Sequence, residues 1–558
     1  MMNQLIFDTS QICYALGIRD AVFSPGSRNA PLSISFSKNS KINTRVIVDE
    51  RSAGFIALGI AQQTQRPVVL CCTSGSALLN YAPAVAEAFY SRTPLIILST
   101  DRPSEWIDHW DGQTIRQQNV FQPFIKDFFQ LPESLEHPDA RWSYEIKFSQ
   151  AINKANSAQI PVHLNIPFRE PYYPEKDQIM TYSDAFKIIR QYPSIKKANC
   201  DDLVLDWNKY NKKIILIGQS QLSSEAKDLL NQLTEQKIPI VADVISNANQ
   251  LPSLIRHHDL FLSNESLQKY LAPDLIVSFG MSLISKNLKL FLRKNNAKHW
   301  QIDAFPESQD PFQKLTGIIE SEPEPVLRCI SHMNAQTETF YQAWLEADKQ
   351  TSQLLTTFDM GFGEFKAVTR IIECLPEEIQ VHLSNSMPVR YVNFLGIKKD
   401  AVRIYANRGT SGIDGSNGTA VGHTMASNSL SLLLTGDLSF LYDRNSFFHS
   451  YDLSKLRIIV FNNFGGGIFD LISGPEWMDP DVKSKYLTTP HERDLKLITQ
   501  EIGFYYTKIT LFEELDTALR TFFDPSNKGR LLEIQSTCSQ NNQIFKALKN
   551  KINEHKYF

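Results

Sequence analysis

Two polar clusters late in the chain have the residue types of a magnesium site. Asp437 lies in Gly-Asp-Leu-Ser, directly after the apolar run LSLLLT, and Asn463 lies in Asn-Asn, directly after LRIIVF. Ligands of open α/β sheets bind beyond the carboxyl ends of parallel strands, so we expect both side chains at one sheet edge. Their carboxylate and amide oxygens are ligands that suit Mg²⁺. The spacing therefore predicts a magnesium diphosphate site.

The residues around these clusters favour the same interpretation. The run of glycines at 465–467 lets the backbone approach a ligand closely, and Ser439 begins a predicted helix whose first amides face a phosphate. Gly-Asp and Asn-Asn are also common turn dipeptides, and either alone would indicate only a turn. Asp470 breaks a G-x-G-x-x-G pattern begun by Gly465, and no G-x-x-x-x-G-K-[ST] is present, so neither a Rossmann dinucleotide loop nor a P-loop is supported.

A second group of candidate residues lies in the first third of the chain. The segment SPGSR (24–28) precedes Asp49-Glu50-Arg51, which follow an apolar run. This position allows the Glu50 carboxylate to point into a site at the end of a strand. The alternative is that Asp49 and Glu50 only cap a helix and interact with its dipole.

The elements that position these residues are short apolar strands separated by helix-length amphipathic stretches. This pattern is typical of parallel sheets covered on both faces by helices, so we predict an α/β fold with mainly parallel sheets. We expect three domains, at 1–185, 186–350 and 351–558, with a linker within 172–211. The first and third domains are free to share a fold without visible sequence similarity. The predicted strands are 45–48, 67–73, 95–100, 213–217, 240–244, 275–279, 299–302, 380–383, 402–405, 430–435, 456–461 and 530–534.

The composition excludes several classes of protein. The 558 residues include 42% hydrophobic and 21% charged residues, which indicates a folded globular chain rather than a disordered or fibrous one. A net charge of −3 gives no indication of nucleic-acid binding. Neither a secretory signal nor a membrane-spanning run is visible, so we predict a cytoplasmic protein without membrane insertion. The seven cysteines have no metal-ligand spacing, and we expect them to be reduced thiols.

As an ordered set, the motifs resemble those of thiamine diphosphate-dependent enzymes. Within that superfamily, the chain is similar over nearly its whole length to the synthase family of menaquinone biosynthesis that forms 2-succinyl-5-enolpyruvyl-6-hydroxy-3-cyclohexene-1-carboxylate. The motifs are SPGSR (24–28), DER (49–51), TSGSA (73–77), TDRP (100–103), QTIRQ (113–117), SNSMPVR (384–390), NRGTSGIDG (407–415), GDLS (436–439) and NNFGGGIF (462–469).

The resemblance implies a domain arrangement and a cofactor site. The first domain would bind the cofactor's pyrimidine and the third its diphosphate and metal, across a homodimer or homotetramer. Asp437, Asn463 and the Gly465 carbonyl would bind Mg²⁺, or Mn²⁺ in its place. Glu50 would be the catalytic residue that hydrogen-bonds N1′ of the aminopyrimidine, and burial would raise its pKa. Cofactor-binding residues would be Pro25, Glu50, Gly412, Ile413, Asp437, Leu438, Ser439, Asn463 and Gly465.

The implied reaction is a transferase reaction, a carboligation. It decarboxylates 2-oxoglutarate and adds the resulting succinyl carbanion to isochorismate by 1,4-addition. These substrates carry carboxylates, which Arg binds through paired hydrogen bonds. The resemblance assigns isochorismate to Arg28, Arg102, Gln113, Lys286 and Arg408, the succinyl carboxylate to Ser386 and Arg390, and an apolar wall to Ile468, Phe469 and Ile472.

Other residues receive simpler interpretations. Lys289, Arg293 and Lys294 are predicted to form a solvated helix face, and His257-His258 to have a surface or loop role. Asn287 stands where some relatives carry a second basic residue, and the role of His109 stays open.

Two alternative functions remain compatible with parts of the pattern. One is another thiamine diphosphate-dependent 2-oxo acid decarboxylase or carboligase, although the Arg-rich loops argue against a substrate as small as pyruvate. The other is a non-catalytic regulatory protein of the same fold. The presence of Glu50, Asp437 and Asn463 argues against a non-catalytic role.

Overall fold

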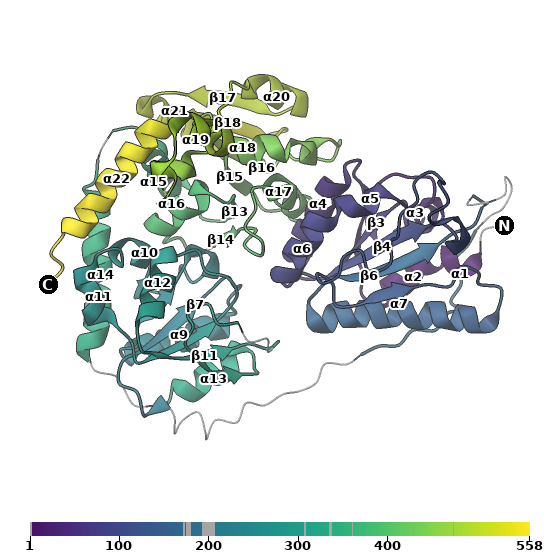
Figure 1. Ribbon diagram of the computed structural model, residues 1–558, viewed down its shortest axis with the longest axis horizontal. Coiled ribbons are helices and arrows are strands. Elements are labelled where there is room, and N and C mark those ends of the chain that lie inside the picture. Colours follow the sequence, from purple (N-terminus) through teal and green to yellow (C-terminus); the bar gives the residue numbers. More distant parts are fainter. Residues whose placement is uncertain are drawn as a thin grey trace.

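The computed structural model has three units, each built on one sheet (Figure 1). It describes residues 3–170, 173–174, 180–191, 207–305, 309–333, 338–359, 361–471 and 474–558. Each sheet has six strands, all paired in parallel and flanked by helices. This confirms the predicted α/β fold class.

The sheet of the first unit has the order β2-β1-β3-β4-β6-β5. Its central strands β3 and β4 are buried along their whole length, as expected for apolar runs covered on both faces. The strands are β1 (Asp20–Phe23), β2 (Asn43–Val46), β3 (Val68–Cys72), β4 (Leu95–Asp101), β5 (Phe128–Gln130) and β6 (Val162–Pro167). The helices are α1 (Gln4–Phe7), α2 (Thr9–Ala15), α3 (Ala30–Ser37), α4 (Glu50–Thr64), α5 (Ser76–Asn80), α6 (Ala82–Tyr90), η1 (Ser104–Trp106) and α7 (Pro138–Ala158).

The sheet of the middle unit has the order β12-β11-β10-β7-β8-β9, and β7 and β10 are parallel neighbours from which successive strands are added toward opposite edges of the sheet. Its strands are β7 (Lys213–Ile217), β8 (Ile240–Ala242), β9 (Leu254–Ile255), β10 (Leu275–Phe279), β11 (Lys298–Ile302) and β12 (Leu315–Ile319). Its helices, with α14 leading to the third unit, are α9 (Ser224–Glu235), η2 (Val244–Ser246), α10 (His258–Phe261), α11 (Glu265–Leu271), α12 (Lys286–Lys294), α13 (Pro323–Ile330) and α14 (Glu338–Thr356).

The sheet of the third unit has the order β14-β13-β15-β16-β18-β17. Its strands are β13 (Ile379–Leu383), β14 (Val402–Tyr405), β15 (Ser431–Gly436), β16 (Leu456–Asn462), β17 (Tyr505–Ile509) and β18 (Arg530–Gln535). Its helices are α15 (Glu364–Cys374), α16 (Met387–Leu395), α17 (Ser416–Ala426), α18 (Asp437–Tyr442), η3 (Arg444–Phe447), η4 (Gly467–Asp470), η5 (Pro475–Trp477), α19 (Pro480–Lys483), η6 (Ser484–Thr488), α20 (Leu495–Ile502), α21 (Phe512–Phe522) and α22 (Cys538–Glu554).

The first and third sheets have the same topology. Counted along the chain within each unit, the strand order of both is 2-1-3-4-6-5. The two units therefore share a strand topology, a possibility that the sequence left open. Every predicted strand is present, with ends shifted by at most two residues. The strands that the sequence patterns did not predict are β1, β5, β6, β9, β12 and β17.

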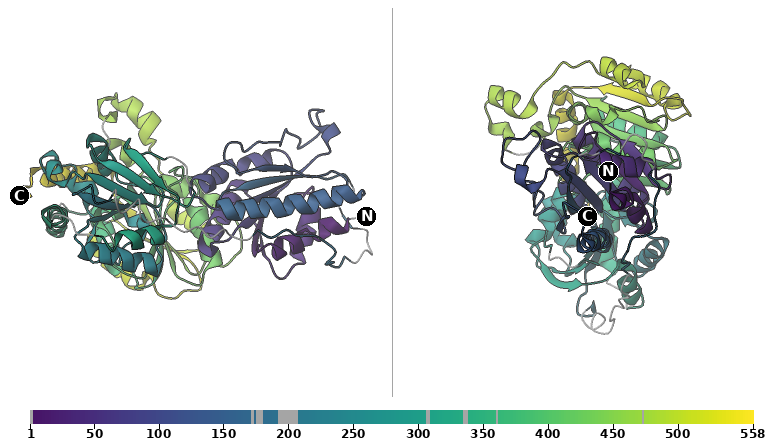
Figure 2. Two further views of the ribbon diagram at one scale, coloured as in Figure 1. Left: turned by 90° about the horizontal axis from the view of Figure 1, so that it is seen from below. Right: turned by 90° about the vertical axis from the view of Figure 1, so that its right-hand side faces the viewer.

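Helix α4 of the first unit packs directly on helix α17 of the third unit (Figures 1 and 2). A Cβ at Gly59 would lie 2.2 Å from the Thr419 carbonyl oxygen, and one at Gly422 would lie 2.2 Å from the Ile56 carbonyl oxygen. The two glycines therefore allow the backbones to touch. One apolar core continues across this contact, from Val22 and Leu70 to Ala420 and Leu433. The first unit and the C-terminal helix lie at opposite ends of the molecule (Figure 2).

Three further expectations can be compared with the structure. The predicted linker 172–211 falls largely outside the described residues. Cys13, Cys71, Cys72, Cys374 and Cys538 are free thiols, but Cys329 is disulfide-bonded, so the expectation that all cysteines are reduced was wrong; Cys200 lies outside the described residues. No helix within the described ranges is long and apolar enough to cross a bilayer. The cytoplasmic location stays a prediction.

Candidate active site

The structure brings Asp437 and Asn463 together at the carboxyl ends of the adjacent strands β15 and β16. The Gly465 N–H donates to Asp437 Oδ2 at 3.0 Å and to Asn463 Oδ1 at 3.2 Å. Two side-chain oxygens therefore accept hydrogen bonds from one backbone N–H, and both side chains lie at one sheet edge, as the spacing of the clusters predicts. Burial raises the pKa of Asp437, while the Leu438 N–H and the nearby His491 act to lower it.

A buried glutamate orients the Asn463 amide. Asn463 Nδ2 donates to Glu364 Oε1 at 2.7 Å, which leaves Oδ1 facing Asp437 and Gly465. Burial raises the pKa of Glu364 to about 7. On the other side, His491 Nε2 lies 3.2 Å from Asp437 Oδ2. Sequence reasoning missed Glu364 and His491, because they lie far along the chain from both motifs and belong to no motif of their own.

The loop before α17 is held from both sides. The Gly412 carbonyl accepts from Asn385 Nδ2 at 2.7 Å, and the Ile413 carbonyl accepts from Ser439 Oγ at 2.7 Å. The Ile413 side chain is 40% exposed. Glu87 of α6 also supports this loop, since its carboxylate accepts hydrogen bonds from the backbone N–H groups of residues 409 and 410. Motif reasoning missed Glu87.

In the first unit, polar groups collect at the carboxyl end of β3. The hydroxyls of Thr73 and Ser74 are buried and have no hydrogen-bond partner among the described residues. Gly26, next to the exposed Pro25, approaches so closely that a Cβ there would lie 2.4 Å from Thr73 Cβ. Unsatisfied hydroxyls beside such a close backbone approach suit a polar ligand.

Glu50 is the first residue of α4, whose N-cap is Asp49. Asp49 therefore caps the helix, as the alternative interpretation states, and the Glu50 side chain is half-buried. Burial raises the pKa of Glu50, with a smaller contribution from Asp49. The neighbours of Glu50 contact the third unit: Asn445 Nδ2 donates to Asp49 Oδ2 at 2.8 Å, and Arg51 donates to the Tyr442 carbonyl at 2.8 Å. Within the described part of the chain, the Glu50 carboxylate forms no hydrogen bond to another residue.

The expected isochorismate residues of the first unit lie on loops after β1 and β4. Arg28 is buried and donates to the Phe168 carbonyl at 2.7 Å. Arg102 pairs with Asp111 at 2.9 Å, whereas Gln113 is exposed and its backbone lies against Gly75. His109 is also exposed.

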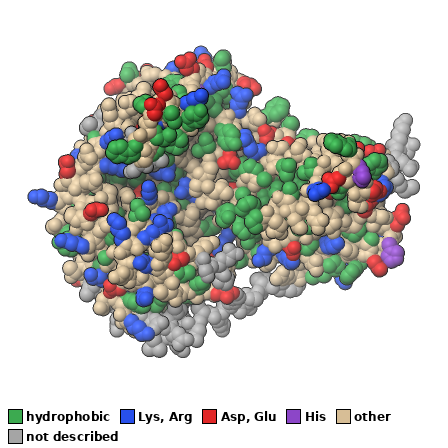
Figure 3. Space-filling view, in the orientation of Figure 1, with side chains coloured by type: hydrophobic (Ala, Val, Ile, Leu, Met, Phe, Trp, Pro, Cys, Tyr) green, Lys and Arg blue, Asp and Glu red, His purple; other side chains and the backbone are tan. Residues whose placement is uncertain are grey.

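A cavity of about 290 Å³ lies between the middle and third units. It is lined by three of the predicted substrate-binding residues, Lys286, Arg390 and Ile468. Lys286 is the first residue of α12, and Arg390 of α16 donates to the Ser386 carbonyl. Lys and Arg side chains gather on this side of the molecule (Figure 3). Phe469 is half-buried in η4, and Ile472 lies outside the described residues.

Arg408 does not line this cavity, and its Nη1 donates to Asn385 Oδ1 at 2.6 Å. Burial lowers its pKa, and the charge of Arg390 adds to this effect. Lys289 is half-buried and donates to the Leu283 carbonyl at 3.1 Å. Burial lowers the pKa of Lys289 as well. The prediction of a solvated face was therefore wrong for Lys289 and right for the exposed Arg293 and Lys294.

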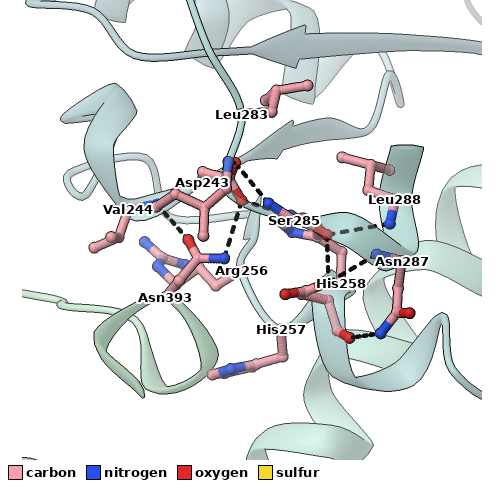
Figure 4. A network of polar contacts seen from close by, with 12 residues as sticks. Asp243, Val244, Arg256, His257, His258, Leu283, Ser285, Asn287, Leu288 and Asn393 are labelled. Carbon is pink, nitrogen blue, oxygen red and sulfur yellow. Dashed lines mark hydrogen bonds and ion pairs between the residues drawn. The ribbon is translucent and has the colours of Figure 1, made fainter. Parts of the chain in front are cut away.

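The prediction for His257-His258 was wrong, because both side chains are buried (Figure 4). His258 Nε2 lies 3.2 Å from Asp243 Oδ1, and His257 Nδ1 donates to the Phe394 carbonyl at 2.8 Å. Asn393 of α16 also donates to Asp243 Oδ1, at 3.0 Å. The histidines thus belong to a polar network that joins the middle unit to the third unit.

The same network reaches the cavity through Asp259. Ser285 Oγ donates to Asp259 Oδ1 at 2.6 Å and the Asn287 N–H donates to it at 3.1 Å. Ser285 is also the N-cap of α12, so the network fixes the start of the helix that carries Lys286. Asn287 donates its amide to the Asp259 carbonyl at 2.6 Å and is committed to this structural role.

Comparisons with known proteins agree with this architecture. Residues 8–130 match the family model described as the N-terminal TPP binding domain of thiamine pyrophosphate enzymes, and residues 183–383 match the middle domain of thiamine pyrophosphate enzymes. Benzoylformate decarboxylase from Polynucleobacter necessarius superposes with a TM-score of 0.70 over 96% of this chain and 99% of that chain, at 17% identity, which shows the fold alone.

Relatives similar over the full length carry one common name, 2-succinyl-5-enolpyruvyl-6-hydroxy-3-cyclohexene-1-carboxylate synthase. The protein from Cytophaga hutchinsonii is 41% identical over 99% of both chains, and that from Flavobacterium johnsoniae is 36% identical over 96% of both. The protein from Porphyromonas gingivalis is 35% identical over 97% of this chain and 96% of its own. The chain therefore belongs to the family of 2-succinyl-5-enolpyruvyl-6-hydroxy-3-cyclohexene-1-carboxylate synthases, which are thiamine diphosphate-dependent enzymes.

Proposed function

We propose that this chain, with thiamine diphosphate and a divalent cation bound, joins the succinyl unit of 2-oxoglutarate to isochorismate. The observation that carries the proposal is that Asp437 and Asn463 both accept a hydrogen bond from the Gly465 N–H. The same loop continues to Ile468, which lines the cavity together with Lys286 and Arg390. The proposed metal site and the proposed site for anionic substrates thus share one loop.

The residues at the end of β15 and β16 fit a hard divalent cation. Asp437 and Asn463 would supply side-chain oxygens to Mg²⁺, or to Mn²⁺. The Gly465 carbonyl accepts a hydrogen bond from the Gly467 N–H at 3.1 Å, and its second lone pair is available for the metal. Glu364 would keep Asn463 in the orientation that the metal requires.

Thiamine diphosphate, when bound, supplies an electron sink for the decarboxylation of a 2-oxo acid. Glu50 would hold a proton at N1′ of the aminopyrimidine, and its raised pKa supports this role. Leu438 and Ser439 would lie against the diphosphate. Gly412, Ile413 and Pro25 would enclose the rings, with Gly412 and Ile413 held by the hydrogen bonds to Asn385 and Ser439.

Substrate carboxylates would be bound by the arginines and by Lys286. Ser386 and Arg390 are assigned to the succinyl carboxylate, because Arg390 reaches the cavity from the helix that Ser386 begins. Ile468 and Phe469 would form the apolar wall, with Ile472. The remaining residues on the isochorismate side are Arg28, Arg102, Gln113, Lys286 and Arg408.

A second copy of the chain would complete the site in a homodimer, which can associate further into a homotetramer. Ile413 is 40% exposed, and Val48, two residues before Glu50, is 52% exposed. Large apolar side chains are thus exposed beside both halves of the proposed cofactor site, which favours their burial against another protein surface. In this arrangement domain 1–185 would bind the pyrimidine of the cofactor. Domain 351–558 would bind the diphosphate with its metal, and 186–350 would be the central domain.

Steady-state assays test the proposal. Purified protein with thiamine diphosphate and Mg²⁺ should consume 2-oxoglutarate together with isochorismate and release carbon dioxide in equal amount. Omission of either the cofactor or the metal should abolish turnover. Turnover of pyruvate in place of 2-oxoglutarate would contradict the proposal and favour another 2-oxo acid decarboxylase or carboligase.

A further inference from the structure

The C-terminal helix α22 contributes a lysine to the cavity between the middle and third units. Lys549 lines this cavity together with Lys286 and Arg390. Its side chain is half-buried, with Nζ 4.8 Å from the centroid of the Phe545 ring. Among the described residues, Lys549 forms no hydrogen bond and no ion pair. A half-buried ammonium group is thus left without a counterion in direct contact.

The charges around the cavity are not balanced. Three cations line it, while Asp259 is the only acidic residue among its described lining residues. The Asp259 carboxylate is already held by Ser285 Oγ at 2.6 Å and by the Asn287 N–H at 3.1 Å. Burial lowers the pKa of Lys549, and the nearby charge of Lys286 lowers it further, while Asp259 acts in the opposite direction. The cavity is therefore electropositive and suits an anion.

We propose that Lys549 binds a carboxylate of the substrate in this cavity, together with Lys286 and Arg390. The inference deepens the proposed function and rests on it. A carboxylate would supply the counterion that Lys549 lacks, and its oxygens would accept charge-assisted hydrogen bonds from the cations. The apolar part of the cavity, from Ile468 and Met387, would contact the carbon chain of the substrate.

The alternative is that Lys549 only packs its aliphatic stem against Phe545. Lys546 of the same helix provides a matched control, because its side chain is exposed and it does not line the cavity. If α22 acted only through its overall charge, removal of either lysine would have the same effect. If Lys549 binds the substrate directly, only its removal should weaken substrate binding.

The experiment compares the wild-type holoenzyme with Lys549→Gln, Lys549→Arg and Lys546→Gln. Each substrate is varied in turn to obtain its own KM, and succinate is titrated calorimetrically as an unreactive dicarboxylate. We expect Lys549→Gln to raise the KM for one substrate about 10-fold with little change in kcat. Lys549→Arg should restore most of the affinity, and Lys546→Gln should match the wild type.

The two substrates identify the carboxylate. A raised KM for the oxo acid, together with a raised Kd for succinate, assigns Lys549 to 2-oxoglutarate, and an effect on isochorismate alone assigns it to the ring substrate. Unchanged KM and Kd values in a folded Lys549→Gln protein would overturn the inference about Lys549. Equal effects of Lys546→Gln and Lys549→Gln would overturn it as well. In both cases, turnover by the wild type would still support the proposed function. Absence of wild-type turnover would contradict the proposed function, and the succinate titration would then decide on Lys549 alone.

Discussion

Gly59 and Gly422 lie at the crossing of α4 and α17, each with its Cα against a backbone carbonyl of the other helix. This contact joins the unit that begins α4 with Glu50 to the unit that carries Asp437. A Cβ at either glycine would lie 2.2 Å from a carbonyl oxygen, and neither backbone can move alone within a continuous core.

We therefore expect Gly422→Ala to destabilise the contact between the first and third units. The added methyl group must push the helices apart, at a cost of about 1–3 kcal/mol. Scanning calorimetry should show a lower unfolding temperature. Gly112→Ala is the control, because a Cβ at Gly112 has no neighbour within 4 Å. A Gly422→Ala protein as stable as Gly112→Ala would mean that the helices pack less closely than described.

Glu50→Gln should separate cofactor binding from turnover. Glutamine keeps the shape of the side chain but cannot hold and release the proton, so turnover should fall by about 10²–10⁴-fold. Cofactor affinity, measured by titration, should change much less. Asp49→Asn is the neighbouring control, since asparagine also caps a helix and replaces a carboxyl group one residue away. Equal losses in the two variants would show that Glu50 has no special role.

Asp437→Ala should weaken cofactor binding that depends on Mg²⁺. Loss of a directly bound carboxylate oxygen should raise the Kd of thiamine diphosphate by about 100-fold or more in calorimetric titrations with Mg²⁺. Asp452→Ala is the control, because its exposed carboxylate contacts only Ser454 in the described part of the chain. Unchanged affinity in Asp437→Ala would remove this residue from the metal site.

The parts of the site that sequence reasoning found are those that follow strands. Asp437 and Asn463 directly follow buried apolar runs, and parallel strands end at a common sheet edge, so local patterns suffice to bring them together. Arg390 adjoins a strand-end loop in the sequence, whereas Lys286 and Ser386 were identified through the resemblance to a known family, which also supplied the roles of all three.

The parts that it missed depend on contacts between distant segments. His257-His258 has no local pattern that indicates burial. Its partners come from the middle and third units, since His258 contacts Asp243 and His257 donates to the Phe394 carbonyl. Lys549 is one of several lysines in a basic C-terminal segment, and only the packing of α22 beside α12 and α16 selects it. Periodicity places Lys549 beside the buried face of the helix, between Phe545 and Ile552, but it does not show which cavity that face borders.

The ion pair of His258 and Asp243 should make the stability of the enzyme depend on pH. Burial acts to lower the pKa of His258, but the hydrogen bond to Asp243 and its charge outweigh this effect and raise the pKa above 6.5. For Asp243, burial acts to raise the pKa, and His258 with the other donors lowers it below 3.8. The contribution of His258 to the free energy of unfolding is therefore complete below the unfolded-state pKa of 6.5, and it is lost as the pH rises through the folded-state pKa. The aspartate contribution is present above 3.8 and is lost as the pH falls through its lowered pKa.

We expect His258→Leu to destabilise the protein by about 3–5 kcal/mol, because the substitution leaves Asp243 buried without its charged partner. The difference in unfolding temperature between wild type and variant should be larger near pH 6 than near pH 9, because the contribution of His258 decreases as the pH rises through its raised pKa. His332→Leu is the control, because this side chain is exposed and forms no hydrogen bond or ion pair with the other described residues. If the difference were the same at both pH values, the titration of His258 would not contribute to the stability of the protein over this range, which would contradict the prediction.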